Sequence, residues 1–109
     1  MSKVFVLYSR NKKDFELRKR AAGNEASVIG GYSSTIGNAH DLLDQSTVDS
    51  VIITSDYHIP RVRLVMNHYR VAGKIMSAEK ILGLQSRKSA LEPLKILLTL
   101  FFLKFHKNL

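Results

Sequence analysis

Residues 51–61 of this chain, Val-Ile-Ile-Thr-Ser-Asp-Tyr-His-Ile-Pro-Arg, decide its fold. A β-branched run stops abruptly at small polar residues, and Pro60 then opens an amphipathic stretch, which is typical of a buried strand that runs into a helix. Proline suits the first turn of a helix because the N–H that it lacks would have no partner there. Hydroxyls, an imidazole and a guanidinium stand at this junction. Since open parallel sheets bind ligands outside the carboxyl ends of their strands, we expect a ligand site here.

The rest of the chain alternates the same two patterns. Expected strands are 3–8, 26–29, 48–54 and 74–77, and expected helices are 14–22, 34–45, 60–73 and 89–109. Strands that alternate with helices indicate a parallel sheet covered on both faces. The sequence therefore predicts one α/β domain over residues 1–109, with a small, mainly parallel sheet of about four strands. The last helix is apolar on most sides, so we expect the sheet, a second subunit or a membrane surface to cover it.

Charge is segregated along the chain. The net charge of +8 divides into +4 over residues 10–20, −5 over 21–60 and +8 over 61–109, with Lys3 completing the sum. Such segregation indicates either solvated helix faces or patches for an anionic partner, such as nucleic acid, a membrane surface or an acidic ligand. The absence of cysteine excludes disulfides and thiolate metal sites, and the four histidines lack the spacing of metal ligands.

Targeting and membrane signals are weak. The apolar run within Met1 to Tyr8 is only five residues long, too short for a signal peptide. The longest apolar stretch, residues 96–103, is eight residues, whereas a bilayer span needs about 20. We therefore expect a protein that is cytoplasmic or peripheral to a membrane.

Two loops are expected to face one cleft, because residues 30–38 and 54–61 both follow strands at the same edge of a parallel sheet. Each loop leads into a helix whose free N–H groups and partial positive charge attract anions. This pattern predicts a site for a phosphate or a carboxylate. The candidate ligand-binding residues are Ser34, Thr35, Asn38, Thr54, Ser55, His58 and Arg61.

Several of these side chains have a purely structural alternative. Ser34 is also a plausible N-cap, and Asn38 is equally consistent with a solvated position on a helix. Thr54 would then complete its strand by bonding to backbone, and Arg61 would pair with Asp56 or face solvent. The two interpretations stay open at this point.

Catalysis has one candidate residue. Ser55, Asp56 and His58 lie too close in one loop to form a triad, and the chain has no G-x-S-x-G elbow, Walker loop or G-x-G-x-x-G fingerprint. His58 is the best acid–base group because an imidazole pKa near neutrality suits proton transfer. Its alternative is a surface turn residue beside a helix start.

Residues 51–61 resemble the "vTS-x-y-H-m-x-R" segment of the YdcF/SanA/ElyC-like domain of unknown function. Residues 34–38 resemble that family's "S-x-x-T-x-E-N" segment, and residues 3–9 are similar to its strand that enters a Ser-Gly-Gly turn. The resemblance covers residues 3–75. It implies a Rossmann-like three-layer sandwich, a link to the bacterial envelope, and a ligand that is nucleotide-type or like S-adenosylmethionine.

The resemblance also implies which positions line the cleft: Thr35, Asn38, Ser55, His58 and Arg61. The chain departs from the family pattern at three places. Gly37 replaces the glutamate before the asparagine, Arg10-Asn11 replace the Gly-Gly pair, and the family's earlier strand has no counterpart before Lys3. These departures indicate a shortened member and leave open whether any reaction is catalysed.

Three functions are compatible with these features. The first is binding of an anionic small molecule through His58 and Arg61. The alternative is a non-enzymatic module that docks to a protein or an anionic membrane through its basic face and residues 94–109. Nucleic-acid binding through residues 10–20 and 61–88 is the weakest, because no motif or interleaved aromatics support it. An open sheet edge also favours a homodimer.

Overall fold

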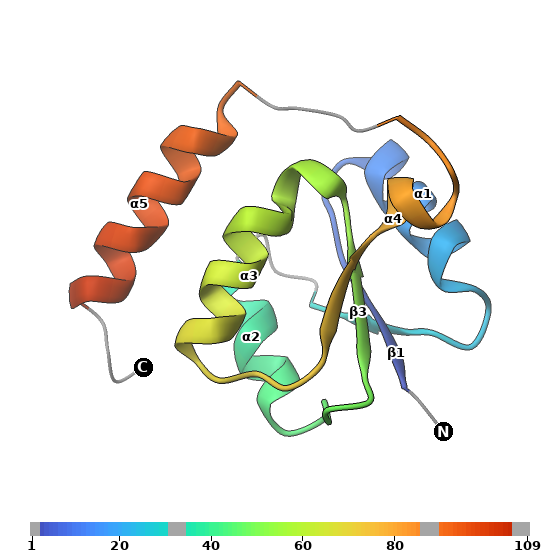
Figure 1. The fold of residues 1–109 in the computed structure, drawn as a ribbon, viewed down its shortest axis with the longest axis horizontal. Helices are drawn as coiled ribbons and strands as arrows, with labels where there is room; N and C mark the ends of the chain where they lie inside the picture. Colours follow the sequence, from blue (N-terminus) through green and yellow to red (C-terminus); the bar gives the residue numbers. More distant parts are fainter. Residues whose placement is uncertain (1–2, 31–34, 86–89, 106–109) are drawn as a thin grey trace.

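Four parallel strands form the centre of the molecule in the computed structural model, which describes residues 3–30, 35–85 and 90–105. The strands are β1 (Val4–Leu7), β2 (Ser27–Ile29), β3 (Val51–Thr54) and β4 (Lys74–Ser77), in the spatial order β2-β1-β3-β4 (Figure 1). In the register of the sheet, Val6 aligns with Val28 on one side and Ile53 on the other. The predicted α/β fold with a small parallel sheet is confirmed.

The two central strands read as continuous apolar runs because helices cover both faces of the sheet. Helices α1 (Lys12–Ala22) and α4 (Ala78–Ile81) lie on one face. Helices α2 (Thr35–Leu43) and α3 (Ile59–His68) lie on the other (Figure 1). The result is a Rossmann-like three-layer sandwich, with its main hydrophobic core between β1, β3 and the pair α2 and α3.

Helix α5 (Glu92–Phe105) is an additional outer element that packs on α3 rather than on the sheet (Figure 1). Leu103 anchors it, because this side chain is buried within the main hydrophobic core. The sheet therefore does not cover α5, and much of its outer surface stays exposed. Over the part of the chain that the structure describes, no helix has the length and apolar character needed to cross a membrane.

Two of the helix boundaries that differ from the expected ones have a clear structural cause. Helix α1 begins at Lys12 because Asn11 is its N-cap and accepts a hydrogen bond from the Asp14 N–H at 3.2 Å. Helix α3 ends at His68 rather than at Gly73, because Arg70 adopts a left-handed conformation with a φ of 57°. Gly73 instead lets the chain pass close to strand β3.

Two further points concern residues 77–92. Helix α4 was not expected; Ser77 caps it by accepting a hydrogen bond from the Lys80 N–H at 3.1 Å. In the sequence, Ser89 and Glu92 stand three residues apart and predict a capping box at the start of the last helix; this pair stays a prediction because Ser89 lies outside the described residues.

The strand order creates a crevice between β1 and β3. The connection after β1 runs through α1 to β2 on one side, whereas the connection after β2 crosses back through α2 to β3 on the other. The loops that leave the carboxyl ends of β1 and β3 therefore diverge toward opposite faces of the sheet. Such a switch point is where open α/β sheets bind ligands.

Candidate functional site

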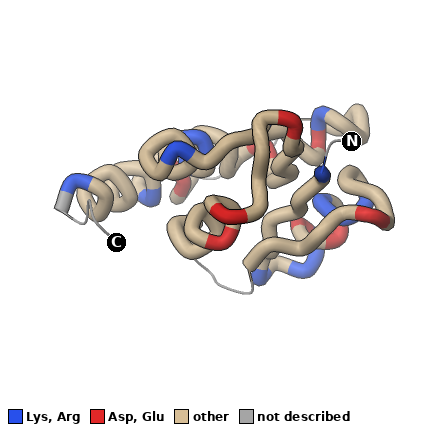
Figure 2. Tube along the Cα trace, turned by 90° about the horizontal axis from the view of Figure 1, so that it is seen from below, with Lys and Arg blue, Asp and Glu red and all other residues tan. Residues whose placement is uncertain are grey.

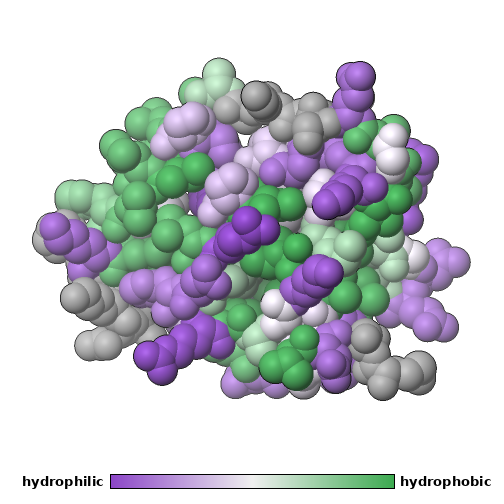
Figure 3. All heavy atoms as spheres, viewed as in Figure 1, coloured by the Kyte–Doolittle hydropathy of each residue, from purple (hydrophilic) through white to green (hydrophobic). Residues whose placement is uncertain are grey.

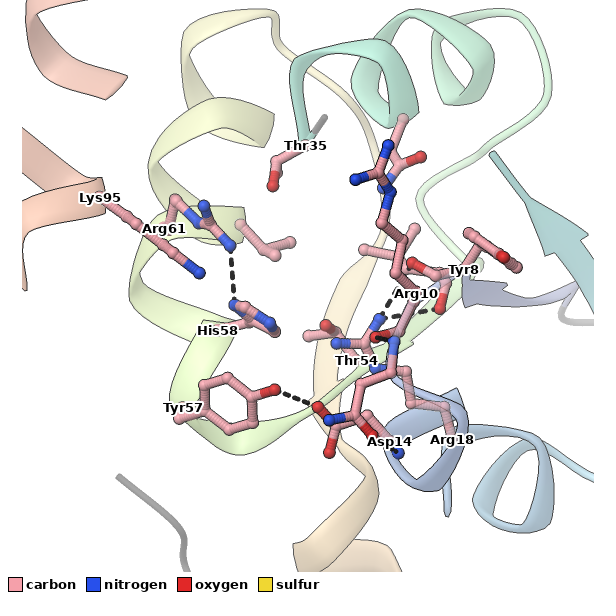
Figure 4. A pocket seen from close by; sticks show the side chains of 15 residues that line it. Tyr8, Arg10, Asp14, Arg18, Thr35, Thr54, Tyr57, His58, Arg61 and Lys95 are labelled. Carbon is pink, nitrogen blue, oxygen red and sulfur yellow. Dashed lines mark hydrogen bonds between the residues drawn. The ribbon is translucent and has the colours of Figure 1, made fainter. Parts of the chain in front are cut away.

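A cavity of about 480 Å³ opens at the switch point between β1 and β3 (Figure 4). Its volume lies within the usual range of small-molecule sites. The lining comes from the two strand ends, from the 3-10 turn η1 (Asp56–His58) and from helices α1, α2, α3 and α5. The lining residues are Leu7, Tyr8, Ser9, Arg10, Asn11, Asp14, Arg18, Thr35, Asn38, Thr54, Tyr57, His58, Arg61, Val62 and Lys95.

The structure brings most of the predicted site residues to this cavity. Those that line it are Thr35, Asn38, Thr54, His58 and Arg61. Ser55 is fully buried and is not among the lining residues. Ser34 lies outside the described residues. The shared location is established, whereas the binding of a ligand by these side chains stays a prediction.

Arg18 is a central part of the site that the sequence analysis missed. Its side chain is only 3% exposed, and its Nε donates a hydrogen bond to the Ser55 hydroxyl at 3.0 Å. Its Nη1 donates to the carbonyl oxygens of Leu7 at 2.9 Å and Tyr8 at 3.3 Å. Arg18 therefore joins the carboxyl ends of β1 and β3 directly beneath the cavity.

The many charges within residues 14–22 predict a helix on the surface, but one face of helix α1 is buried. Asp14 and Arg18 lie one turn apart, and both are buried. The sequence did contain a signal for this burial, because a helix that covers a sheet must bury one face whatever its composition. The only large apolar residues of α1 are Phe15 and Leu17, so polar side chains had to complete that face.

Asp14 fixes the turn that carries His58. Its carboxylate accepts a hydrogen bond from the Tyr57 hydroxyl. The ring of Tyr57 in turn lies against the His58 ring, with centroids 4.1 Å apart. Helix α1 thereby holds the η1 turn in place from the opposite wall of the cavity (Figure 4).

His58 and Arg61 meet a carboxylate that the sequence analysis did not assign to the site. Glu92, the first residue of α5, is 4% exposed; its Oε1 lies 2.9 Å from Arg61 Nε and its Oε2 lies 3.3 Å from His58 Nδ1. The Arg61 contact is an ion pair and not an aligned hydrogen bond. The structural alternative for Arg61 was a pair with Asp56 or exposure to solvent; the structure instead shows an ion pair between Arg61 on α3 and Glu92 on α5.

His58 is neutral at physiological pH. Burial, reinforced by the charges of Arg18 and Arg61, lowers its pKa from 6.5 to about 4, although Glu92 acts in the opposite direction. Arg61 Nη2 approaches His58 Nδ1 at 2.8 Å. A neutral ring accepts this hydrogen bond at Nδ1 and carries its proton on Nε2. The expected pKa near neutrality was wrong because the sequence could not show how deeply the imidazole is enclosed.

The lowered pKa predicts that acid destabilises the fold. Between pH 6.5 and about 4 the unfolded chain protonates His58 whereas the folded chain does not, so the free energy of unfolding decreases as the pH falls through this window. Urea unfolding at pH 7 and pH 5 measures the loss. His58→Gln should reduce the loss, and His68→Gln, at an exposed position of α3, should not. Equal losses in all three proteins would contradict this account.

Positive charge dominates the cavity. Its lining includes the basic residues Arg10, Arg18, Arg61 and Lys95 and the carboxylate of Asp14. The buried carboxylate of Glu92 behind Arg61 is the second negative charge, so basic groups still outnumber acidic ones. Helices α1, α2 and α3 also begin at this cavity, so their partial positive charges add to the same field. Figure 4 shows Lys95, Arg61 and His58 on one side and Arg10, Asp14 and Arg18 on the other.

Asn38 offers the cavity an unused acceptor. Its side chain is 5% exposed, and its Oδ1 has no hydrogen-bond partner among the residues that the structure describes. A buried amide oxygen without a partner costs free energy, and a ligand with an N–H or O–H group would remove that cost. Within the described ranges, His, Asp and Glu do not gather in groups of three that would hold a metal ion.

Comparison of the chain with protein-family models, with curated proteins and with solved structures gives no match in any of the three. The resemblance to the YdcF/SanA/ElyC-like domain therefore stays a prediction.

Proposed function

We propose that this chain binds an anionic small molecule of nucleotide type in the cavity between β1 and β3. The observation that carries the proposal is the excess of positive charge at the switch point. Four basic side chains and three helix starts surround a cavity with one lining carboxylate. Guanidinium groups and helix N-termini are the usual partners of phosphate.

The two ends of the cavity favour different parts of such a ligand. Arg61 and Lys95, beside the start of α3, suit the phosphate group. The Oδ1 of Asn38 suits a ligand hydroxyl or amine. The positive field disfavours the sulfonium of S-adenosylmethionine, so a nucleoside phosphate is the better candidate of the two.

The site supports binding more strongly than catalysis. A histidine with a pKa of about 4 is not in its imidazolium form at neutral pH, so His58 does not serve there as a general acid. Its role in the proposal is to accept a hydrogen bond from Arg61 and to orient that guanidinium toward the cavity. Arg61 and His58 thus act as one anion-binding unit.

A thermal-shift screen tests the proposal. The panel comprises nucleotides, S-adenosylmethionine, sugar phosphates and dicarboxylates. We expect a nucleoside phosphate to raise the melting temperature of the native chain, and Arg61→Ala to weaken its binding by at least about tenfold, the effect of a charged hydrogen bond. Lys95→Ala removes a lining charge without disturbing Glu92 and should also weaken binding.

The matched control is Arg63→Ala, which removes an exposed charge from the same helix, two residues beyond Arg61. This variant should bind like the native chain. The proposal is wrong if a cooperatively melting protein responds to no anion. It is equally wrong if both lining variants respond as the native chain does.

A further inference from the structure

The outward half of α5 is apolar and exposed. We call this surface the α5 apolar face; its residues are Leu91, Leu94, Leu97, Leu98, Leu100 and Phe101. Leu94, Leu97 and Leu98 are 55%, 66% and 60% exposed. In the space-filling view, apolar side chains gather over α5 at the left of the molecule (Figure 3). Contiguous exposed apolar surface of this kind marks an interaction site.

The width of this face limits what covers it. At 3.6 residues per turn, the five of its residues that lie on α5 span about 160° of the helix circumference, and Leu91 directly precedes the helix. A single partner helix covers only the narrower stripe of a coiled-coil seam. An apolar phase that extends on both sides of the helix covers the whole arc, and the acyl boundary of a lipid bilayer is such a phase.

The exposed charges near the α5 apolar face are basic. Residues 61–105 contain only two carboxylates, Glu79 and Glu92, and both are buried. On α5 and on α3, the helix that it packs against, the exposed charged residues are both basic: Arg63 on α3 and Lys104 on α5. In Figure 2 the acidic positions are spread over the rest of the molecule rather than gathered in one place.

This charge distribution argues against a second copy as the occupant. Two copies joined through α5 would bring surfaces of the same sign together, which weakens association. Anionic headgroups are complementary to the same surface, and basic residues held near them strengthen binding. The apolar arc and the basic residues near it therefore favour an anionic lipid surface over a second copy of the chain.

We propose that the α5 apolar face docks this protein on the surface of an anionic lipid bilayer, with α5 lying parallel to the membrane plane. None of the residues of this face lines the cavity, so the docking is independent of the ligand proposed above. The membrane contact combines insertion of leucine side chains with attraction between basic residues and lipid headgroups.

Vesicle flotation of the full chain tests this proposal. The vesicles are phosphatidylcholine alone and phosphatidylcholine mixed with phosphatidylglycerol. We expect the chain to float with the anionic vesicles and much less with the neutral ones. The double variant Leu97→Gln/Leu98→Gln should lower the partition coefficient at least about tenfold, because it withdraws two apolar side chains from the bilayer.

The matched control is Val48→Gln/Leu84→Gln, which replaces two exposed apolar residues elsewhere on the surface. It should bind vesicles like the native chain, and circular dichroism should show that both variants are folded. The proposal is overturned if the chain binds neither kind of vesicle or both equally, or if the α5 variant binds like the control. A second copy would be the occupant if the native chain binds no vesicles and sedimentation shows it to be a dimer. The α5 variant would then sediment as a monomer.

Discussion

Replacing Arg18 with methionine is expected to lower the free energy of unfolding by roughly 3 kcal/mol, the scale of losing several hydrogen bonds from one buried charged group. The guanidinium donates to the hydroxyl of Ser55 and to the carbonyl oxygens of Leu7 and Tyr8. Methionine keeps much of the volume but leaves these acceptors without a donor. The carboxyl ends of β1 and β3 would lose the side chain that joins them.

Equilibrium urea unfolding measures this effect. The matched control is Arg20→Met on the same helix, where the side chain is exposed, and it should change the free energy of unfolding by no more than about 0.5 kcal/mol. If the two variants lose the same small amount, Arg18 does not hold the site together and the account of the cavity floor fails.

Replacing Glu92 with glutamine is expected to change stability and ligand affinity in opposite directions. The substitution leaves Arg61 without its charged partner, and breaking a largely buried ion pair costs roughly 3 kcal/mol. The same carboxylate competes with any ligand anion for Arg61, because its Oε1 lies 2.9 Å from Arg61 Nε. Its removal should therefore raise the affinity for a nucleotide by about tenfold, equivalent to about 1.4 kcal/mol.

Calorimetric titration together with urea unfolding separates the two effects. The control is Glu79→Gln, which removes another buried carboxylate that does not line the cavity. That variant should lose stability without gaining affinity. If Glu92→Gln binds a nucleotide more weakly than the native chain does, Glu92 positions Arg61 for the ligand instead of competing with it.

The sequence predicted the sheet well because the strand signals are local. The run that ends at Thr54 is apolar and β-branched, and it became the buried strand β3. Helix ends were less predictable. Arg70 ended α3 by adopting a left-handed conformation, which is uncommon for residues other than glycine, whereas Gly73 had appeared to be the stop signal.

The contacts within the site were much harder to predict, because they join residues far apart in the chain. Arg18 bonds Ser55 across 37 positions, and Asp14 bonds Tyr57 across 43. No periodic pattern encodes such pairs. Glu92 was expected only as part of a helix cap, yet its carboxylate reaches the start of α3 because α5 packs there.

The most direct test of the central claim, that an anion binds at the switch point, is a ¹H–¹⁵N NMR titration of the native chain with adenosine monophosphate. The account predicts that backbone amide signals shift within residues 8–11, 35–38 and 54–61, at the strand ends and helix starts that surround the cavity. Signals in β2 and in the outer part of α5 should stay unchanged. Shifts confined to those distant elements, or none at millimolar nucleotide, would contradict it.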